Sequence, residues 1–376
     1  MAPTSLRAHH KSRAGCTTCK SKKVKCDEGQ PCSYCVKRQL SCSLAPSSSP
    51  STESGRGSKT PEIRVVQPYE GTSFSFTDFG LYHHFAISTA FAQADDSASA
   101  SVWRDVVGDL ATQYPYLLHE ILATAALHQR LALPDQAAYL ERVAAEHQAK
   151  AIPLFRQALA SISAETALPL FACACLFIPY HFAAAKDASS LLFNEEAGTL
   201  AEWLILIQGC AAITMEQNAT LMHSSLRALL GELYTPKVED LGNGPTDERL
   251  VDLYSKLPIT PEQRETYSDT LVRLRVCFYL SDKADSPLDK KNAALRFPSI
   301  INNNFRTELA AKHPAALIIM AYWCVLLNRV EDRWWLKDRV KPLLIKIKEL
   351  IPMQYTTIIE WPLGEVGVYP EPEIGV

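Results

Sequence analysis

Six cysteines lie in a short stretch near the N-terminus of this 376-residue chain, and their spacing is regular. They follow the pattern C-x2-C-x6-C-x5-C-x2-C-x6-C and are Cys16, Cys19, Cys26, Cys32, Cys35 and Cys42. Thiolates are the preferred soft ligands of zinc, and each tetrahedral ion takes four ligands. Six thiolates complete two such sites only if two sulfurs are shared. The pattern therefore predicts a cluster of two Zn²⁺ ions, and its near-duplicate C-x2-C-x6-C halves suit a pseudo-symmetric arrangement.

A metal store and a disulfide knot are the other uses of clustered cysteines. The first residues, such as His9, His10 and Lys11, form no apolar run of the signal-peptide type. We therefore expect a reducing compartment, where dense cysteine favours metal over disulfides. The other five cysteines are scattered, and Cys173 and Cys175 are expected to be buried thiols of an apolar helix.

Residues 1–42, termed the head, have almost no apolar core of their own. Val24, Leu40 and the adjoining Leu44 are nearly all that is available. Each structural zinc ion contributes about 10–16 kcal/mol on binding, so metal ligation must supply the folding free energy of the head.

The charge of the chain is unevenly divided. The formal net charge is −3, but the head carries nine Lys or Arg against Asp27 and Glu28, a net of +7. The remaining residues therefore carry −10. Six thiolates and two zinc ions would leave the head at +5. This asymmetry predicts a polyanionic partner for the head.

Four lysines separate the second and third cysteines: Lys20, Lys22, Lys23 and Lys25. We expect them on a short helix, which fits the major groove of double-stranded DNA, where guanine presents two acceptors. Arg13, Lys37 and Arg38 are candidates for phosphate contacts. A basic run is more commonly a solvated face or a nuclear-localisation patch. Within a zinc cluster we favour DNA contact, and nuclear import can use the same lysines.

The run Gly15-Cys16-Thr17-Thr18-Cys19-Lys20-Ser21-Lys22-Lys23-Val24-Lys25-Cys26-Asp27-Glu28 resembles the fungal binuclear zinc cluster family of transcription factors. The resemblance implies that Cys16 and Cys32 bridge the ions. One zinc would add Cys19 and Cys26, and the other Cys35 and Cys42. It also implies that Lys22 and Lys23 read a CGG triplet while Lys20 and Lys25 contact phosphates. The family implies a nuclear, sequence-specific factor for RNA polymerase II genes.

One triplet carries too little information to select a site in a genome. A good base contact discriminates by about 1–3 kcal/mol, so a second half-site or a partner is expected.

Composition divides the chain into three regions. After the head, residues 43–61 contain fourteen Ser, Thr, Pro or Gly out of nineteen, which predicts a flexible linker over 43–72. From 73 to 376 we expect one all-helical regulatory domain of about ten helices, with a poorly structured tail. The fold class is thus a small metal-stabilised DNA-binding domain, a disordered linker and an all-α domain.

Apolar residues recur at helical spacing in the large domain. One stripe comprises Leu140, Val143, Ala144, His147, Ala151, Leu154, Phe155 and Ala158, with Pro153 expected to kink or restart the helix. Thr260-Pro261-Glu262-Gln263 is a capping-box start, and the buried face that follows it is Tyr267, Leu271, Leu274 and Phe278. The uncharged runs 167–185 and 314–327 are expected to be buried core helices and not membrane spans.

Four further segments resemble the regulatory domain of sterol-uptake-control transcription factors. They are Leu81-Tyr82-His83-His84-Phe85, the 117–128 helix with Ala125-Ala126-Leu127-His128, Trp334-Trp335-Leu336 and Trp361-Pro362. The resemblance implies an all-helical domain that binds a sterol or other apolar ligand, and a homodimer formed through that domain. No heptad run follows Cys42, so a coiled-coil dimer is not predicted.

Two rival functions remain open. An enzyme of the terpene-cyclase type would use Asp95-Asp96, but the sequence continues Ser97-Ala98-Ser99 without the further carboxylate that magnesium needs. No nucleophile elbow, zinc-protease motif or phosphate loop is present, so we expect no enzyme. The second rival is a repressor or co-regulator that acts mainly through protein contacts of the helical domain.

Overall fold

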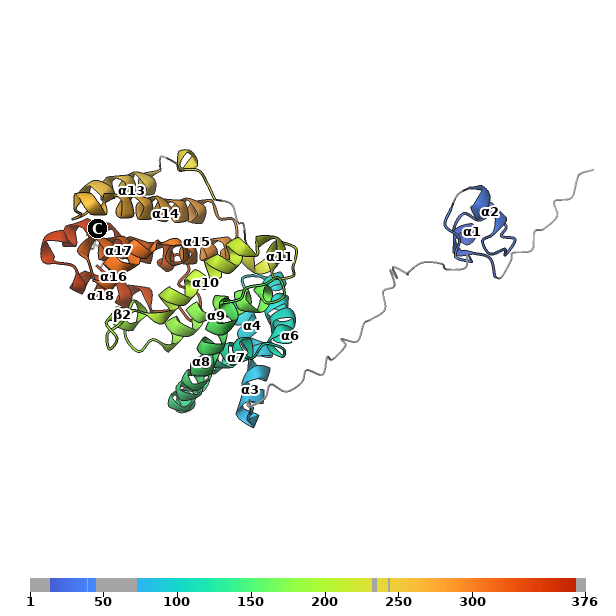
Figure 1. Ribbon diagram of the computed structural model, residues 1–376, viewed down its shortest axis with the longest axis horizontal. Coiled ribbons are helices and arrows are strands. Elements are labelled where there is room, and N and C mark those ends of the chain that lie inside the picture. Colours follow the sequence, from blue (N-terminus) through green and yellow to red (C-terminus); the bar gives the residue numbers. More distant parts are fainter. Residues whose placement is uncertain (1–13, 39, 45–72, 232–234, 243, 370–376) are drawn as a thin grey trace, which may run out of the picture. The chain divides into compact units, whose positions relative to one another are not determined.

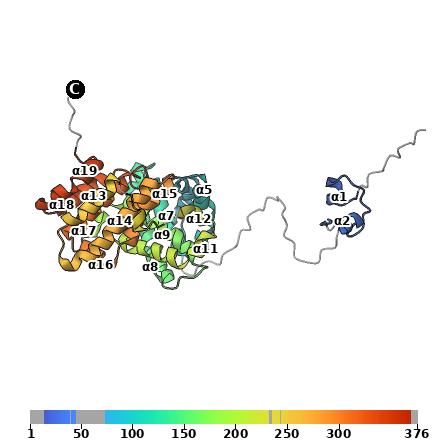
Figure 2. The same ribbon diagram turned by 90° about the horizontal axis from the view of Figure 1, so that it is seen from above.

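The structure is a computed structural model that describes residues 14–38, 40–44, 73–231, 235–242 and 244–369 (Figures 1 and 2). The chain divides into two compact units, Met1–Val65 and Val66–Val376. Arg13, most of the expected linker and the expected C-terminal tail lie outside the described residues.

The N-terminal unit contains two short helices, α1 (Thr17–Ser21) and α2 (Ser33–Lys37). Each begins directly after a cysteine that serves as its N-cap, Cys16 for α1 and Cys32 for α2. Val24 is 36% and Leu40 39% exposed, so the buried interior of this unit consists of sulfur and not of aliphatic side chains.

The second unit is mainly helical, as its periodicity predicts. Its longer helices are α3 (Phe76–His84), α7 (Pro115–Gln129), α8 (Ala137–Leu159), α9 (Ala167–Ala184), α10 (Glu202–Glu216), α13 (Pro245–Lys256), α14 (Arg264–Lys283), α15 (Pro287–Ile300), α16 (Asn303–Ala310), α17 (Pro314–Asn328) and α18 (Val340–Leu350). Shorter helices are α4 (Ala90–Gln93), α5 (Ser97–Ser101), α6 (Gly108–Ala111), α11 (Asn218–Met222), α12 (Arg227–Leu230) and α19 (Glu360–Glu365), and π-helical turns cover Phe85–Thr89 and Val102–Val107.

Two neighbouring groups of helices share one continuous core. Helices α3, α8 and α9 pack around α7, while α14, α16 and α18 pack against α17, and α10 contacts both α9 and α15 (Figure 1). Helices α9 and α17 are buried on nearly all sides because the runs that form them lack charge. Between the groups, the rings of Trp203 and Trp323 stack with centroids 6.2 Å apart, and each indole N–H donates to a backbone carbonyl at 2.8 Å.

Local sequence signals explain where several helices begin. Thr260 and Gln263 form the expected capping box, which opens a 3₁₀ turn that leads into α14. All four residues predicted for the inner face of α14, starting with Tyr267, are buried. The stripe on α8 also faces the core. Of the two outcomes predicted for Pro153, a kink or a restart, the restart is wrong, because α8 runs unbroken through this residue.

A two-residue antiparallel hairpin joins β1 (Phe193–Asn194) to β2 (Thr199–Leu200). No period-two signal predicts this hairpin, because two paired residues are too few to form a pattern. Gly198 in the connecting loop has φ of +63°, a left-handed conformation that glycine adopts without steric cost.

Helix α9 is the one described helix that is long and apolar enough to cross a membrane, and the sharply bent pair α16–α17 would add a second. Within α9, 78% of the apolar window is buried inside the protein. Burial of this kind is what the sequence predicted for a core helix.

The Asp95-Asp96 pair has structural partners. The side chain of Asp95 is buried, pairs with Lys291 of α15 and lies 2.5 Å from the Arg333 guanidinium. Asp96 caps α5 by accepting from the Ser99 N–H at 2.7 Å. Both carboxylates therefore hold elements together.

Glu120 is an ionisable group at the centre of the core. It lies on α7 and is fully buried, and burial raises the pKa of its carboxyl well above the ordinary value. When the Gln148 side-chain amide on α8 is oriented with its nitrogen toward Glu120, that nitrogen donates to Glu120 Oε1 at 3.2 Å. Burial therefore favours the protonated, neutral form of this carboxyl in the folded protein.

We expect Glu120→Gln to stabilise the second unit in a pH-dependent way. The pKa of Glu120 is higher in the folded than in the unfolded chain. Above about pH 4.5 the unfolded chain has lost this proton while the folded chain still holds it, so the free energy of unfolding of the wild type falls as pH rises. A glutamine at position 120 does not ionise, so it avoids this loss of stability, and its side-chain oxygen can still accept a hydrogen bond from Gln148. Thermal melts should show a gain on the order of 1–3 kcal/mol at pH 8 and little difference at pH 4. The exposed Glu216→Gln is the control, and an equal gain at both pH values would contradict the account.

Candidate metal centre and nucleic-acid interface

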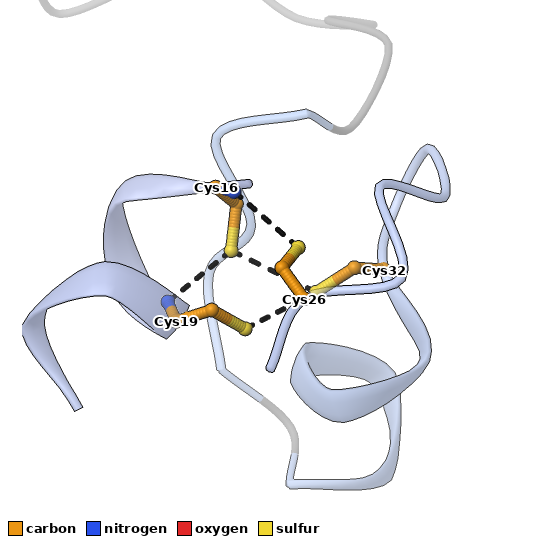
Figure 3. A group of neighbouring side chains, drawn as sticks. All are labelled: Cys16, Cys19, Cys26 and Cys32. Carbon is orange, nitrogen blue, oxygen red and sulfur yellow. Dashed lines mark hydrogen bonds between the residues drawn. The ribbon is translucent and has the colours of Figure 1, made fainter. Parts of the chain in front are cut away.

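The six cysteine sulfurs form two overlapping groups of four. One group is Cys16, Cys19, Cys26 and Cys32, and the other is Cys16, Cys32, Cys35 and Cys42. Within each group all sulfurs lie within 4.8 Å of one another, and the shared pair, Cys16 and Cys32, is 3.7 Å apart. Figure 3 shows four of these side chains converging from α1 and the loops beside it. The arrangement can hold two metal ions with two sulfurs in common.

The backbone repeats itself between the two halves with an offset of sixteen residues. The Cys16 N–H points to Cys26 Sγ at 3.3 Å, and the Cys32 N–H points to Cys42 Sγ at the same distance. The N–H of Val24 donates to the Cys19 carbonyl, and that of Leu40 donates to the Cys35 carbonyl. The pseudo-symmetry expected from the spacing is therefore present in the fold.

Crowding of the thiols favours a cation at their centre. Burial, together with neighbouring sulfurs, raises the pKa of Cys35 to about 12 and that of Cys19 further still. Several thiolates packed this closely would repel one another without positive charge. A zinc ion supplies that charge and deprotonates the thiols that ligate it.

Asp27 ties the first half of the cluster to the second. Its carboxylate oxygens accept from the Ser33 N–H at 3.0 and 3.1 Å, in the first turn of α2. The Ser33 hydroxyl also donates to this carboxylate, and that bond, followed by the bonds from the N–H, lowers the pKa of Asp27, so the carboxylate is charged at neutral pH. An anion here also suits the positive end of the helix dipole, although α2 is short.

The basic helix is shorter than expected. Of the four lysines only Lys20 lies inside α1, while Lys22 caps it and Lys25 lies beyond it. The helix ends in a Schellman motif, because the N–H of Val24 donates to the Cys19 carbonyl and that of Lys23 to the Lys20 carbonyl. The cysteines on either side must converge on the cluster, which leaves too few residues for a second helical turn.

Lys23 has a conformation that normally selects glycine. Its φ is +54°, in the left-handed region, at the position after the helix cap. A residue with a β-carbon is disfavoured there by about 1–2 kcal/mol. The turn presents the lysine on the surface: Lys20, Lys22, Lys23, Lys25, Lys37 and Arg38 are all exposed.

The positive charge is concentrated in one half of the pseudo-symmetric unit. By the sixteen-residue offset, Lys20 corresponds to Val36 and Lys22 to Arg38. The loop of the first half thus carries four lysines, whereas that of the second carries Lys37 and Arg38. The first half is the more basic face for a polyanion.

A second feature, which the sequence did not reveal, is a cavity of about 990 Å³ in the helical unit. Its walls come from α9, α10 and α15 together with Trp103 and Trp335. Trp103 is almost fully buried, and its indole Nε1 has no hydrogen-bond partner among the described residues. Cys175, expected to be buried, is only half-buried and lines this cavity with Cys210, while Cys173 is buried as predicted.

The histidines of the helical unit have partners or lie at the surface. His84 contacts His128 at 3.2 Å, and His147 bonds Asp78 at 3.1 Å. His181 Nδ1 lies 2.7 Å from the Phe177 carbonyl, and His83 is exposed.

Comparison with known proteins gives two family matches. Residues 14–51 match the fungal Zn(2)-Cys(6) binuclear cluster domain, and residues 80–233 match the fungal specific transcription factor domain. A "Zn(2)-C6 fungal-type transcription factor" of Gibberella zeae is 25% identical over 95% of this chain and 86% of the relative. The similarly named afumD protein of Aspergillus fumigatus is 22% identical over 83% and 84% of the two chains. "Sterol uptake control protein 2" of Saccharomyces cerevisiae is 25% identical over 72% of this chain and 30% of the relative.

Proposed function

We propose a function for this chain from the family matches described above. The chain carries a fungal Zn(2)-Cys(6) binuclear cluster domain and a fungal specific transcription factor domain. Its homologues are fungal Zn(2)-C6 transcription factors. The family implies DNA-binding transcription regulation, and its members are generally nuclear. For this chain we propose a nuclear, sequence-specific factor for RNA polymerase II genes. Residues 1–42 bind DNA, residues 43–72 link the two parts, and residues 73–376 regulate.

The overlap of the two four-sulfur groups is the observation that supports this proposal most. Cys16 and Cys32 are the sulfurs common to both groups, so we assign them as the bridging ligands. The other four each serve one ion: Cys19 and Cys26 the first, Cys35 and Cys42 the second. Cysteine ligation of this kind fixes the turn that carries the lysines.

We assign base contact to Lys22 and Lys23, and a CGG triplet as the target. Both are exposed at the end of α1, where their amines can reach guanine O6 and N7 in the major groove. Lys20, Lys25, Lys37 and Arg38, with Arg13 from outside the described residues, neutralise phosphates. Lys23 occupies a left-handed position that favours glycine. A favourable contact between this lysine and DNA would offset the conformational cost of having a lysine there.

Chromatin occupancy separates this function from a co-regulator that acts mainly through protein contacts. We expect wild-type chain to occupy CGG-containing sites and the Cys16→Ser chain to lose them. Occupancy retained in the Cys16→Ser chain would show recruitment through the helical domain and would overturn the assignment.

For the helical unit we propose an apolar ligand, with a sterol as the class suggested by the printed name of the yeast relative. The cavity supports this, since pockets of roughly 300–1,000 Å³ accommodate small molecules. A buried N–H without a partner costs about 1–3 kcal/mol, so the Trp103 indole favours a ligand with an acceptor, such as a hydroxyl oxygen.

Filling the cavity should block this ligand. Ala211 of α10 lines the cavity, so Ala211→Trp should weaken binding of a fluorescent sterol at least about tenfold, or 1.4 kcal/mol. Ala212→Trp, one residue along the helix and off the cavity wall, is the control. Binding that survives Ala211→Trp unchanged would place the sterol elsewhere, and no binding by the wild type would reject the sterol class.

A further inference from the structure

Two cysteines of the helical unit meet in the wall of the cavity. Cys175 lies on α9 and Cys210 on α10, and these two helices pack against each other (Figure 1). Both cysteines line the cavity, and their thiols interact directly. Neither is among the six cysteines of the metal centre. The protein therefore has a pair of neighbouring thiols outside the zinc site.

The other three cysteines of the helical unit differ from this pair in exposure. Cys173, Cys277 and Cys324 are fully buried and are not part of the cavity wall. Cysteines in such positions act as small apolar side chains and are inert. Cys175 and Cys210 are partly exposed, and because both line the cavity, a small molecule that enters it can reach both sulfurs.

The surroundings of the pair favour a reactive thiolate. Interaction with Cys175 lowers the pKa of Cys210, and the same interaction raises the pKa of Cys175. Lys291 of α15 opposes part of that rise. The charged residues of the cavity wall are three cations and two carboxylates: Lys283, Lys291, Arg296, Asp285 and Asp289. Reactive cysteines are typical of partly exposed, electropositive surroundings, so Cys210 is the better nucleophile of the two.

We propose that Cys175 and Cys210 form a peroxide-reactive pair that is oxidised to a disulfide. Thiols already in contact on two packed helices need only a small movement to reach the S–S bond length of about 2 Å. In the reducing compartment that we expect for this chain, a disulfide is commonly transient and redox-sensing. The assigned oxidant is a hydroperoxide, which supplies the O–O bond that is reduced.

The oxidation proceeds in two balanced steps. Cys210 Sγ attacks one peroxide oxygen, so that an S–O bond forms and the O–O bond breaks. The second oxygen leaves with the thiol proton as water or as an alcohol. Cys175 Sγ then attacks the resulting sulfenic acid, so that the S–S bond forms and the S–O bond breaks. Hydroxide leaves as water with the Cys175 proton, and the two thiols have given two electrons to the peroxide.

A disulfide at this position would act on the cavity. It would join α9 to α10, and α10 also packs against α15, so all three helices that supply most of the wall are affected. Peroxide would thereby change the space that the proposed apolar ligand occupies. The pair itself depends on the cavity and not on a bound sterol or DNA.

Peptide mapping of the full-length, zinc-loaded chain tests the pair. The chain is treated with hydrogen peroxide or with cumene hydroperoxide, free thiols are alkylated, and a tryptic digest is analysed by mass spectrometry. Cys175 falls in the peptide 157–186 and Cys210 in the peptide 187–227. We expect these two peptides to be joined by a bond that dithiothreitol cleaves. Faster reaction with hydrogen peroxide would assign a small oxidant, and faster reaction with cumene hydroperoxide an organic one.

Variants locate the bond, because Cys173 shares the first peptide with Cys175. Cys175→Ser and Cys210→Ser should each lose the cross-link. Cys173→Ala, at a buried cysteine two residues along α9, is the matched control and should keep it. Circular dichroism shows whether each variant is folded, and the map of the wild type remains a test if one of them is not.

Three outcomes would overturn the proposal. The first is a wild type that forms no cross-link between these peptides with either peroxide. The second is a folded Cys175→Ser chain that keeps the cross-link, or a folded Cys173→Ala chain that loses it. The third is a cross-link that forms only after the chain has been unfolded in urea. None of these results bears on sterol or DNA binding, because neither ligand is present.

Discussion

Cys16→Ser should remove the zinc cluster and abolish DNA binding. Cys16 lies in both four-sulfur groups, and its sulfur is 3.7 Å from those of Cys32 and Cys35. Its loss therefore damages both metal sites at once. Each structural zinc contributes about 10–16 kcal/mol, while aliphatic burial in the head is minimal, so nothing else can keep the head folded.

Zinc content per chain, measured by elemental analysis after gel filtration, checks this prediction. We expect two ions in the wild type and none or one weakly held ion in Cys16→Ser. Cys42→Ser, at a half-exposed sulfur of one group only, should retain one ion. Cys210→Ser, a cysteine of the helical unit, should retain two. Two tightly held ions in Cys16→Ser would refute the shared-sulfur assignment.

Lys22→Ala and Lys23→Ala should each reduce discrimination between a CGG duplex and a mismatched duplex by about 1–3 kcal/mol, roughly 5- to 150-fold. The reason is that these lysines, exposed at the end of α1, are assigned to guanine acceptors. Lys37 lies in the second half of the cluster. Lys37→Ala should instead weaken binding to all DNA sequences alike and reduce the slope of log affinity against log salt concentration by about one.

Lys23→Gly separates folding from recognition. Glycine relieves the left-handed conformation, whose φ is +54°, so the head should be as stable as the wild type or more so. Discrimination should nevertheless fall as it does in Lys23→Ala. Fluorescence anisotropy with the two duplexes gives the discrimination, and chelator titration gives the stability. Unchanged discrimination in all three variants would mean that these lysines do not read bases.

The cysteine cluster could be predicted in detail because six spacings and a tetrahedral metal leave few arrangements. The all-helical fold class of the second unit could also be predicted, because apolar stripes such as the one on α8 repeat over several helical turns. The capping box at Thr260 identified a helix start because its reciprocal bonds depend on only four residues. Each of these signals is local.

What the sequence did not reveal depends on distant residues. Helix α1 ends at Ser21 because sulfurs from both halves must converge, which no local propensity reports. Pro153 is accommodated within α8, and the cavity forms where α9, α10 and α15 fail to fill the space between them.

The central claim is that a two-zinc, six-cysteine cluster presents lysines that read DNA sequence. The most direct test is the affinity of the zinc-loaded chain for a CGG-containing duplex and for a scrambled duplex of equal length, over a range of salt. We predict preference for the CGG duplex that persists as salt rises, while both affinities fall steeply because phosphate contacts release counterions. Equal affinity for the two duplexes at every salt concentration would contradict the claim.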